Sequence, residues 1–278
     1  MPRFSAPPFF AVVSLFVLNP AVADRTYCDD DWVCVERRED AKSIEVFVEN
    51  RKPYPVTVSL RARTRGVSLD GSSTVTLVID GGHRQRAFGG TKRNDSGSLR
   101  VSFDWTVGRP DVEHDDKYRY RLPYRDGEHY YILQGFGSRF SHTGLERYTI
   151  DFAMEVGTPV HAARDGVVAR LEERHDRGCW EDGCGAYANY IVILHDDGTT
   201  GEYYHLQNEG ALVEEGQYVK RGQLIGLSGN TGHTTMPHLH FGVYRADTWG
   251  QTRSLRVRFR SADGKVFEPR RGGRHEAG

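Results

Sequence analysis

Alternation of apolar and polar side chains along the first third of the chain limits its fold more than any other feature. In the clearest run, apolar residues stand at every second position from Leu99 to Val107. Similar runs cover residues 44–49, 56–61 and 75–79, with Gly, Asn and Asp turns between them. A period of two is typical of strands with one buried face. Several short strands of this kind predict a small β-sandwich, of the immunoglobulin-like class, over residues 24–110.

A charged segment separates this region from the rest of the chain. Residues 108–118 (GRPDVEHDDKY) contain Gly and Pro among their charges, so we expect a linker at 111–125. Beyond it the sequence again consists of strand-like runs and glycine turns, and residues 190–194 (YIVIL) are typical of a strand covered on both faces. We therefore expect an all-β protein whose second domain, residues 126–262, is an antiparallel sheet of barrel-like form.

The last residues of the chain are basic. Residues 251–278 contain eight Lys and Arg against three Asp and Glu. Leu255, Val257 and Phe259 alternate with arginines, which predicts a strand with a solvated basic face. We expect a frayed basic tail at 263–278. The alternative is weak contact of these cations with an anionic polymer of the cell envelope.

Charge is otherwise balanced. The chain has 37 Lys and Arg and 38 Asp and Glu, a formal net charge of −1, which argues against nucleic acid as a partner. An apolar content of 38%, with 11% aromatic residues, is enough for packed cores and argues against a disordered chain.

The N-terminus has the features of a secretory signal peptide at residues 1–23. Arg3 precedes an apolar run (FFAVVSLFVL), and Ala21 and Ala23 form a small-x-small cleavage site. The run is too short for a permanent membrane anchor. We therefore expect an exported protein, periplasmic or secreted.

The four cysteines fit export. Cys28 and Cys34 lie close together in the sequence, as do Cys179 and Cys184, so local pairing closes two small loops in an oxidising compartment. The alternative is a structural zinc site built from all four cysteines. Neither pair has the two-residue spacing of a zinc knuckle, so we favour disulfides.

Histidines are concentrated in the second domain. Nine of the twelve fall between residues 129 and 240. His238 and His240 are two residues apart, so on a strand both point to one face while Leu239, Phe241 and Val243 point into a core. Two adjacent imidazoles suit a metal or acid–base site better than a core.

The residues around these histidines resemble those of a known family. Residues 140–245 resemble the lysostaphin/LytM-type zinc endopeptidases, which cleave stem peptides or cross-links of peptidoglycan. The resemblance rests on an early His142 and Asp151, a Tyr-x-His-Leu strand with His205, and the final pair His238 and His240. It includes the framework segments 157–160 (GTPV), 165–168 (DGVV), 222–226 (GQLIG) and 238–241 (HLHF). It implies the duplicated hybrid motif barrel fold for this domain.

The resemblance also implies a division of roles among these residues. His142, Asp151 and His240 are expected to bind one Zn²⁺, with water in the fourth position. His205 and His238 are expected to act beside the metal as general base and as oxyanion stabiliser or proton donor. The sequence does not divide these roles between the two histidines.

The spacing between the first two ligands departs from the family pattern. Eight residues separate His142 from Asp151, where the commoner pattern has three. Glu146 is a rival carboxylate by spacing. We favour Asp151, because it directly precedes Phe152 and the following Gly-Thr-Pro-Val turn, as the family aspartate does.

Several other residues are candidates for supporting roles. Asn189 and Tyr203 flank the strands that carry the site and are expected to support it, and residues 134–136 are expected to line the approach to His142. The loop at residues 175–187, closed by Cys179 and Cys184, carries Trp180 and is expected to form a wall of the substrate groove or a structural cap. We expect the remaining histidines of this domain to be surface or hydrogen-bonded residues, and we regard His233 as a candidate for lining the groove.

The predicted function is hydrolysis of peptidoglycan peptides by an exported zinc metalloendopeptidase. One alternative is a non-catalytic regulator or binding module on the same scaffold, although this chain keeps all five family residues. A second alternative is cleavage of Gly-rich proteins. The predicted partner is a peptidoglycan peptide, with no nucleic acid and no stable membrane anchor, and the N-terminal domain is a candidate site for a protein regulator.

Overall fold

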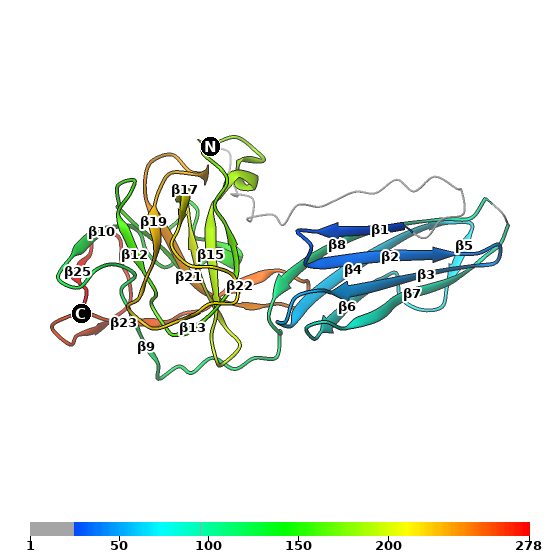
Figure 1. The fold of residues 1–278 in the computed structure, drawn as a ribbon, viewed down its shortest axis with the longest axis horizontal. Coiled ribbons are helices and arrows are strands. Elements are labelled where there is room, and N and C mark those ends of the chain that lie inside the picture. The colour runs from blue at the N-terminus through cyan, green and yellow to red at the C-terminus, as the bar shows by residue number, and fades with distance from the viewer. Residues whose placement is uncertain (1–24, 95) are drawn as a thin grey trace. The chain divides into compact units, whose positions relative to one another are not determined.

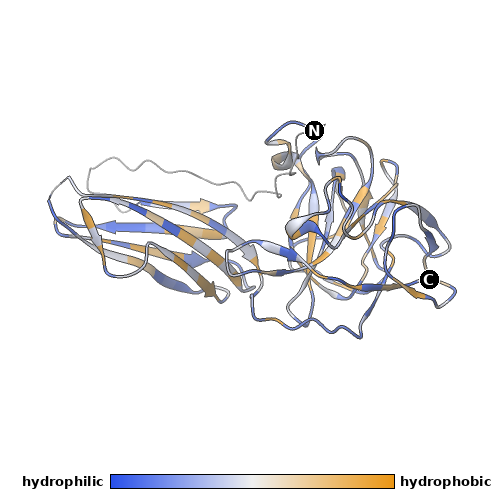
Figure 2. Cartoon of the chain, turned by 180° about the vertical axis from the view of Figure 1, so that it is seen from behind, coloured by the Kyte–Doolittle hydropathy of each residue, from blue (hydrophilic) through white to orange (hydrophobic). Residues whose placement is uncertain are grey.

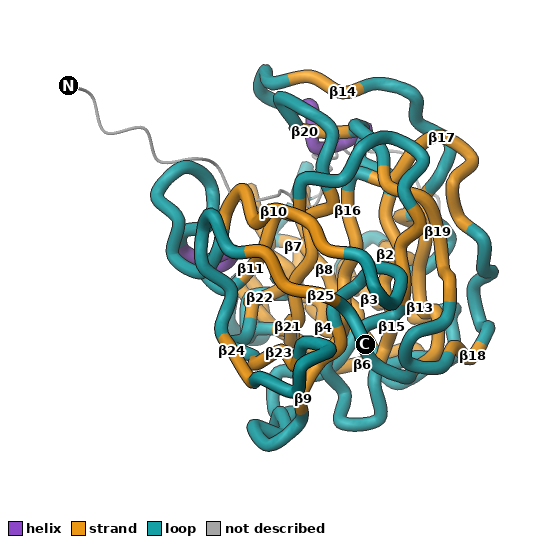
Figure 3. Tube along the Cα trace, turned by 90° about the vertical axis from the view of Figure 1, so that its left-hand side faces the viewer, coloured by secondary structure: helices purple, strands orange, loops and turns teal. Residues whose placement is uncertain are grey.

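The structure is a computed structural model that describes residues 25–94 and 96–278, so the predicted signal peptide at 1–23 lies outside the described residues. Strands dominate its regular structure, which confirms the predicted all-β class (Figure 3). Helix in the described ranges is limited to two 3₁₀ turns, η1 (Gly144–Glu146) and η2 (Cys184–Tyr187). Among these residues we find no helix with the length and apolar character needed to cross a membrane.

The described chain forms two compact units. The first comprises residues 25–110 together with 246–251, and the second comprises residues 111–245 and 252–278 (Figure 1). The first unit contains two antiparallel sheets. One has the order β1 (Arg25–Asp29), β2 (Val33–Glu39), β3 (Ser43–Asn50), β7 (Arg84–Lys92), β5 (Val67–Leu69), and the other has the order β6 (Thr74–Ile79), β4 (Val56–Arg65), β8 (Ser98–Val107).

The core of the first unit lies between these two sheets. Val46 and Val48 of β3, and Val58 of β4, are fully buried, as the alternation predicts, and the strands show alternating hydropathy in Figure 2. The rings of Tyr27 in β1 and Phe103 in β8 lie 6.1 Å apart, which joins one sheet to the other. The unit is therefore a two-sheet sandwich, and its immunoglobulin-like class stays a prediction.

The second unit is built around one large sheet of nine strands. Its order is β18 (Tyr218–Val219), β13 (Gly166–Glu172), β15 (Tyr190–Leu194), β16 (Thr200–Tyr204), β21 (Leu239–Ala246), β11 (Thr149–Phe152), β10 (His129–Gln134), β25 (Arg274–Glu276), with β22 (Thr252–Ser254) also paired to β21. Three smaller sheets complete the unit: β12 (Pro159–His161), β19 (Leu224–Ser228), β17 (Leu206–Ala211); β14 (Gly178–Cys179), β20 (Gly232–His233); and β24 (Val266–Phe267), β23 (Arg258–Arg260), β9 (Arg119–Arg121).

The central strand β21 separates a core from a polar face. Leu239, Phe241 and Val243 are fully buried in the hydrophobic cluster, as predicted from their alternation with His238 and His240. Phe241 packs on Tyr203 of the neighbouring strand β16, with 4.9 Å between ring centroids. This apolar layer fixes the register of the strands and therefore the positions of the histidines on their other side.

The expected linker at 111–125 is partly structured. Residues 119–121 form β9, which pairs in parallel with β23. Tyr120, Leu122 and Tyr124 are almost completely buried in the core of the second unit. The structure differs from the expectation because these apolar residues alternate with arginines, and the alternation outweighs the charge of the preceding residues.

The expected frayed tail at 263–278 is also structured. Residues 274–276 form β25, which pairs with β10, and Ala277 is buried with its N–H donated to Glu128 O. Val266 and Phe267 form β24 against β23. The basic composition indicates which side chains face water, but backbone pairing holds the segment in place.

Both predicted disulfides are confirmed. Cys28 and Cys34 are directly opposite each other in the β1–β2 pair and are bonded, and Cys179 is bonded to Cys184. The alternative of a zinc site with four cysteine ligands is wrong, because no free cysteine remains in the described chain.

Candidate active site

Three adjacent strands bring the predicted site residues together. Asp151 of β11 stands directly opposite His240 of β21 in an antiparallel pair, and Tyr204 of β16 stands opposite His240 on the other side. Directly opposed side chains on one face of a sheet lie within contact distance. His142 reaches the same face from the loop after β10, and His205 follows directly after β16.

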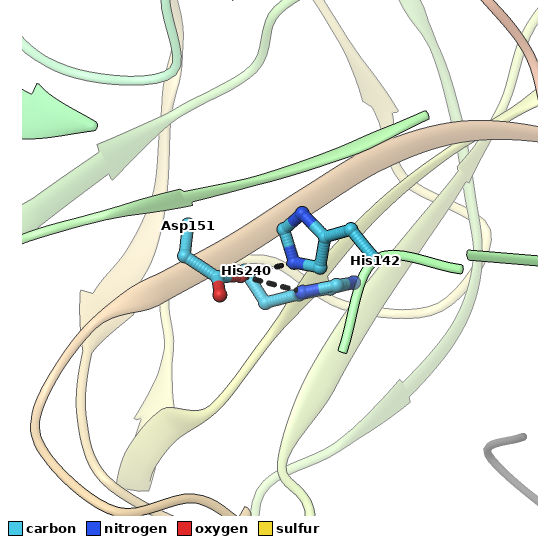
Figure 4. Close-up of side chains that lie close together, drawn as sticks. All are labelled: His142, Asp151 and His240. Carbon is cyan, nitrogen blue, oxygen red and sulfur yellow. Dashed lines mark hydrogen bonds and ion pairs between the residues drawn. The ribbon is translucent and has the colours of Figure 1, made fainter. Parts of the chain in front are cut away.

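Three potential ligand atoms converge at this face (Figure 4). His240 Nδ1 lies 2.8 Å from Asp151 Oδ1, and His142 Nε2 lies 3.1 Å from the same oxygen. The ligand atoms of these three residues all lie within 4.8 Å of one another, and all three side chains are buried. The longer spacing between His142 and Asp151 is absorbed by η1, so the carboxylate favoured by the sequence is the one that meets both histidines.

The other two predicted histidines lie beside this cluster. The rings of His205 and His238 are 4.5 Å apart, and His238 Nε2 lies 3.8 Å from Asp151 Oδ1. His205 Nδ1 lies 2.7 Å from Thr231 O, and His238 Nδ1 lies 2.8 Å from Met236 O. A carbonyl oxygen can only accept, so each Nδ1 donates and carries the proton of the neutral ring.

Burial and neighbouring charges shift the pKa values of these groups. Burial lowers the pKa of His205 well below its ordinary value, with a further contribution from His238 and His240, and burial also lowers the pKa of His238. Burial opposes ionisation of Asp151, but His142 and His240 outweigh it and hold the pKa of Asp151 well below its ordinary value. For His240, burial is outweighed by Asp151 and Glu146, which raise its pKa to about 9. The site therefore combines an ionised carboxylate with two neutral histidines.

Gln134 positions the carboxylate. Its Nε2 donates to Asp151 Oδ2 at 2.6 Å and to Ser141 Oγ at 2.7 Å. Oδ2 is thereby engaged, and Oδ1 is the oxygen turned toward the two histidines. Residues 134–136 were expected near His142, but the sequence does not reveal this contact, whose only signal there is the position of Gln134 at the end of a strand.

A hydrogen-bonded chain extends from the far side of His240. The Tyr244 hydroxyl donates to Glu146 Oε2 at 2.6 Å, so it accepts from Nε2 of His240, which lies 3.2 Å away. Glu146 lies on the opposite side of His240 from Asp151, with its Oε2 3.7 Å from His240 Nε2. The rival carboxylate is therefore close to the site but faces the other nitrogen of the ring.

Gly242 provides the space for this chain. It lies between His240 and Tyr244 on the same strand face, where a Cβ atom would stand 2.5 Å from the Tyr244 ring. Because Gly242 has no side chain, the Tyr244 ring lies over this residue and reaches His240. Tyr244 was not among the predicted site residues, although its spacing of four from His240 on a strand places both on one face.

The cluster lies in a cleft of about 290 Å³. An aromatic stack lies along it, in which Trp180 is 4.1 Å from His233 and 5.2 Å from Phe140 between ring centroids. Trp180 and His233 thus line the cleft as the sequence suggested. The complete lining is Leu133, Gln134, Ser138, Phe140, Ser141, His142, Glu146, Asp151, Trp180, His205, His233, Thr234, Thr235, Met236, His238, His240 and Arg271.

The two predicted supporting residues occupy different places. Asn189 is fully buried, and its Nδ2 donates to Gln207 O while its N–H donates to Thr231 Oγ1, so it ties together the segments on either side of His205. Tyr203 points into the core, where its hydroxyl accepts from the N–H of Ala163. Tyr204 is the tyrosine of this strand that shares the face of His240.

The remaining histidines of the second unit lie outside the ligand cluster. His161 Nδ1 bonds Gly222 O, and His195 Nδ1 bonds Asp165 O. His175 packs on Tyr187, and His129 is exposed at the start of β10. These placements agree with the prediction that they are surface or hydrogen-bonded residues.

Comparison with known proteins gives a family match for part of the chain. Residues 146–252 match the model of peptidase family M23. The peptidoglycan DD-endopeptidase ShyA of Vibrio cholerae is 46% identical over 114 residues, which are 40% of this chain and 24% of ShyA. Lysostaphin of Staphylococcus simulans is 40% identical over 99 residues, which are 35% of this chain and 18% of lysostaphin.

A solved structure is similar over more of the chain. A zinc-containing peptidase from Vibrio cholerae is 20% identical, covers 81% of this chain and 83% of its own, and has a TM-score of 0.35. The chain spans less than a quarter of the length of ShyA and of lysostaphin. Their likeness is therefore a likeness of one domain.

Proposed function

We propose that this protein is an exported zinc-dependent endopeptidase acting on the stem peptides or cross-links of peptidoglycan, because residues 146–252 match the model of peptidase family M23. One observation carries the proposal. His142 Nε2, Asp151 Oδ1 and His240 Nδ1 converge in a cleft that His205 and His238 also line.

The residues present fit a zinc ion. Two imidazole nitrogens and one carboxylate oxygen are a donor set that zinc favours, and three protein ligands leave a position open for water. His142 Nε2 is buried without a hydrogen-bond partner, although Asp151 Oδ1 is only 3.1 Å away. A metal ion bound by both atoms would explain why they lie close together without forming a hydrogen bond. We propose His142, Asp151 and His240 as the zinc ligands.

Zinc bound there would supply a Lewis acid and lower the pKa of a bound water. The two neutral histidines supply the proton transfers. Because Nδ1 of His205 and of His238 donates to a backbone carbonyl, Nε2 of each ring is the nitrogen that accepts a proton. A proton taken there can then pass to the leaving amine. Both rings are held for this role by these hydrogen bonds.

Export and partners are further parts of the proposal. Each unit contains a disulfide, which fits an oxidising compartment such as the periplasm or the cell exterior. We propose peptidoglycan peptide as the substrate. The first unit carries none of the site residues, and we keep it as a candidate site for a protein regulator.

Digestion of muropeptides tests the proposal. We expect zinc-loaded protein to release products that mass spectrometry assigns to one cleaved peptide bond. His240→Ala should lose both zinc and turnover, whereas His205→Ala should keep zinc and lose about 10²–10⁴ in kcat, the usual size of general acid–base catalysis. His161→Ala is the matched control, because that imidazole bonds Gly222 O outside the cleft.

Two other results would favour the alternatives. Stoichiometric zinc without cleavage of muropeptides or of Gly-rich peptides would favour a non-catalytic binding module. Cleavage of Gly-rich peptides alone would identify a protein endopeptidase.

A further inference from the structure

The C-terminal segment, which lies beyond the residues matched by the family model, reaches the catalytic cleft. Its strand β25 pairs with β10, the strand that leads to His142. The pairing continues toward the cleft, because Gly272 N–H donates to Ile132 O at 2.9 Å and Ile132 N–H donates to Gly273 O at 3.0 Å. Residues 269–273 are therefore held beside the end of β10.

A close backbone approach fixes the other end of this turn. A Cβ atom at Gly135 would lie 2.6 Å from Pro269 O and 2.9 Å from Arg270 Cα. Gly135 therefore lets residues 269–270 lie directly on the strand end that carries Gln134. Gly273 N–H donates to Arg270 O at 3.0 Å and closes the turn. Arg271 is thus presented by a backbone that is fixed on both sides.

Apart from histidines, Arg271 provides the cationic side chain in the wall of the cleft. Apart from histidines, the ionisable groups that line the cleft are Glu146, Asp151 and Arg271. The two carboxylates are buried and bonded to Tyr244 and Gln134. Arg271 is exposed, and within the described residues it forms no ion pair. A guanidinium at the edge of a substrate cleft is available to a group from outside the chain.

The chemistry of that group follows from the guanidinium. Arginine presents planar paired N–H donors that match a carboxylate in a bidentate arrangement. Stem peptides of peptidoglycan carry free carboxylates near their cleavable bonds, and these carboxylates are carboxamides in amidated forms. We propose that Arg271 binds a carboxylate of the substrate peptide, so that the cleft prefers acidic stem peptides to amidated ones. The proposal rests on the peptidase function proposed for this cleft.

Matched peptides test the preference. Synthetic stem peptides with each carboxylate in turn replaced by a carboxamide are compared as substrates of the full zinc-loaded protein. We expect Arg271→Ala to raise KM about fivefold for the free-carboxylate peptide and to leave kcat unchanged, because a partly exposed charge pair contributes at this level. For one of the amidated peptides, the wild-type protein should already have the raised KM, and Arg271→Ala should not raise that KM further.

Two further variants separate charge and geometry from general effects. Arg270→Ala removes a neighbouring exposed arginine that does not line the cleft, and it should leave KM unchanged. Arg271→Lys should restore only part of the preference, because the ammonium keeps the charge but loses the paired donors. An equal rise in KM for all peptides, or no rise for any, would overturn the proposal.

A binding measurement separates this proposal from the proposed function. Fluorescence anisotropy with labelled peptides gives Kd for full-length His205→Ala protein with and without Arg271→Ala. Loss of the carboxylate preference in the double variant would support the Arg271 site even if the wild type hydrolysed neither peptide. Equal Kd values for free and amidated peptides on the His205→Ala protein would reject the site even if hydrolysis were observed.

Discussion

At the scale of single residues, the contact between Tyr244 and His240 determines which imidazole nitrogen faces Asp151. The Tyr244 hydroxyl donates to Glu146 and so accepts from His240 Nε2, which leaves Nδ1 on the side of Asp151. Loss of such an outer hydrogen bond typically lowers metal affinity about 10–100-fold. We expect Tyr244→Phe to weaken zinc binding by this amount, measured by competition with a chromophoric chelator.

Tyr203→Phe is the control for that measurement. Tyr203 is equally buried on the adjacent strand, but its hydroxyl accepts from Ala163 N–H in the core. The control should lower stability without changing zinc affinity. Equal zinc affinity in Tyr244→Phe and in the wild type would show that the Tyr244 hydroxyl does not orient His240.

Gly242 gives a second test of the same contact. An added methyl would stand 2.5 Å from the Tyr244 ring, so Gly242→Ala must displace that ring. We expect zinc affinity to fall as it does in Tyr244→Phe, and the double variant to be no weaker than the single ones, because both remove one contact. The same chelator competition measures the zinc affinity of all three variants. Additive losses of affinity in the double variant would contradict this explanation.

The five residues that the sequence singled out lie together in the cleft, but the sequence did not indicate the residues that hold them. His238 and His240 follow from a period of two, and His142, Asp151 and His205 follow from the order of the family motifs. The contacts of Gln134, Tyr244 and Glu146 with the site depend on which strands are neighbours in the sheet. A single sequence does not report strand order, so these residues became visible only when β10, β11 and β21 were found side by side.

At the scale of elements, the loop closed by Cys179 and Cys184 provides the aromatic side of the cleft. Trp180 is 46% exposed and stacks on both Phe140 and His233. A ring that is half exposed beside a cleft can stack on substrate, at about 0.5–1.5 kcal/mol. We therefore expect Trp180→Ala to raise KM for muropeptides about threefold to tenfold and to leave zinc content unchanged.

Trp249→Ala is the matched control for the Trp180 variant. Trp249 is similarly exposed, at 56%, but it lies on residues 246–251 and does not line the cleft. Steady-state kinetics with soluble muropeptides should show no change in this control. If Trp180→Ala also left KM unchanged, Trp180 would be a structural cap rather than a contact for substrate.

Element boundaries were predicted best where apolar alternation is uninterrupted. The strands of the sandwich follow from residues such as Val46 and Val58. The strands β9 and β25 were missed because each is three residues long and has charged residues at both ends. Their pairing partners, β23 and β10, lie more than a hundred residues away in the sequence. Local composition carries no information about such long-range pairing.

At the scale of the whole molecule, positive and negative side chains nearly balance. We therefore expect individual buried groups to determine how the free energy of unfolding depends on pH. Burial lowers the pKa of His195 to about 4, and burial raises the pKa of Glu202 to about 7. His195 has a folded pKa below its unfolded value, so its contribution to stability is present above pH 6.5 and is lost as pH falls toward 4. Glu202 has a folded pKa above its unfolded value, so its contribution is present at low pH and is lost as pH rises from 4.5 to 7.

These two contributions oppose each other between pH 5 and 7. Each changes the free energy of unfolding by about 2 kcal/mol over that window, because one pKa unit corresponds to about 1.4 kcal/mol. In the wild type they nearly cancel. We expect His195→Gln to become more stable relative to the wild type as pH falls from 7 to 5, and Glu202→Gln to become less stable. Urea unfolding of the second unit, measured in chelator so that loss of metal does not contribute, gives both differences, and parallel pH dependence in all three proteins would contradict the argument.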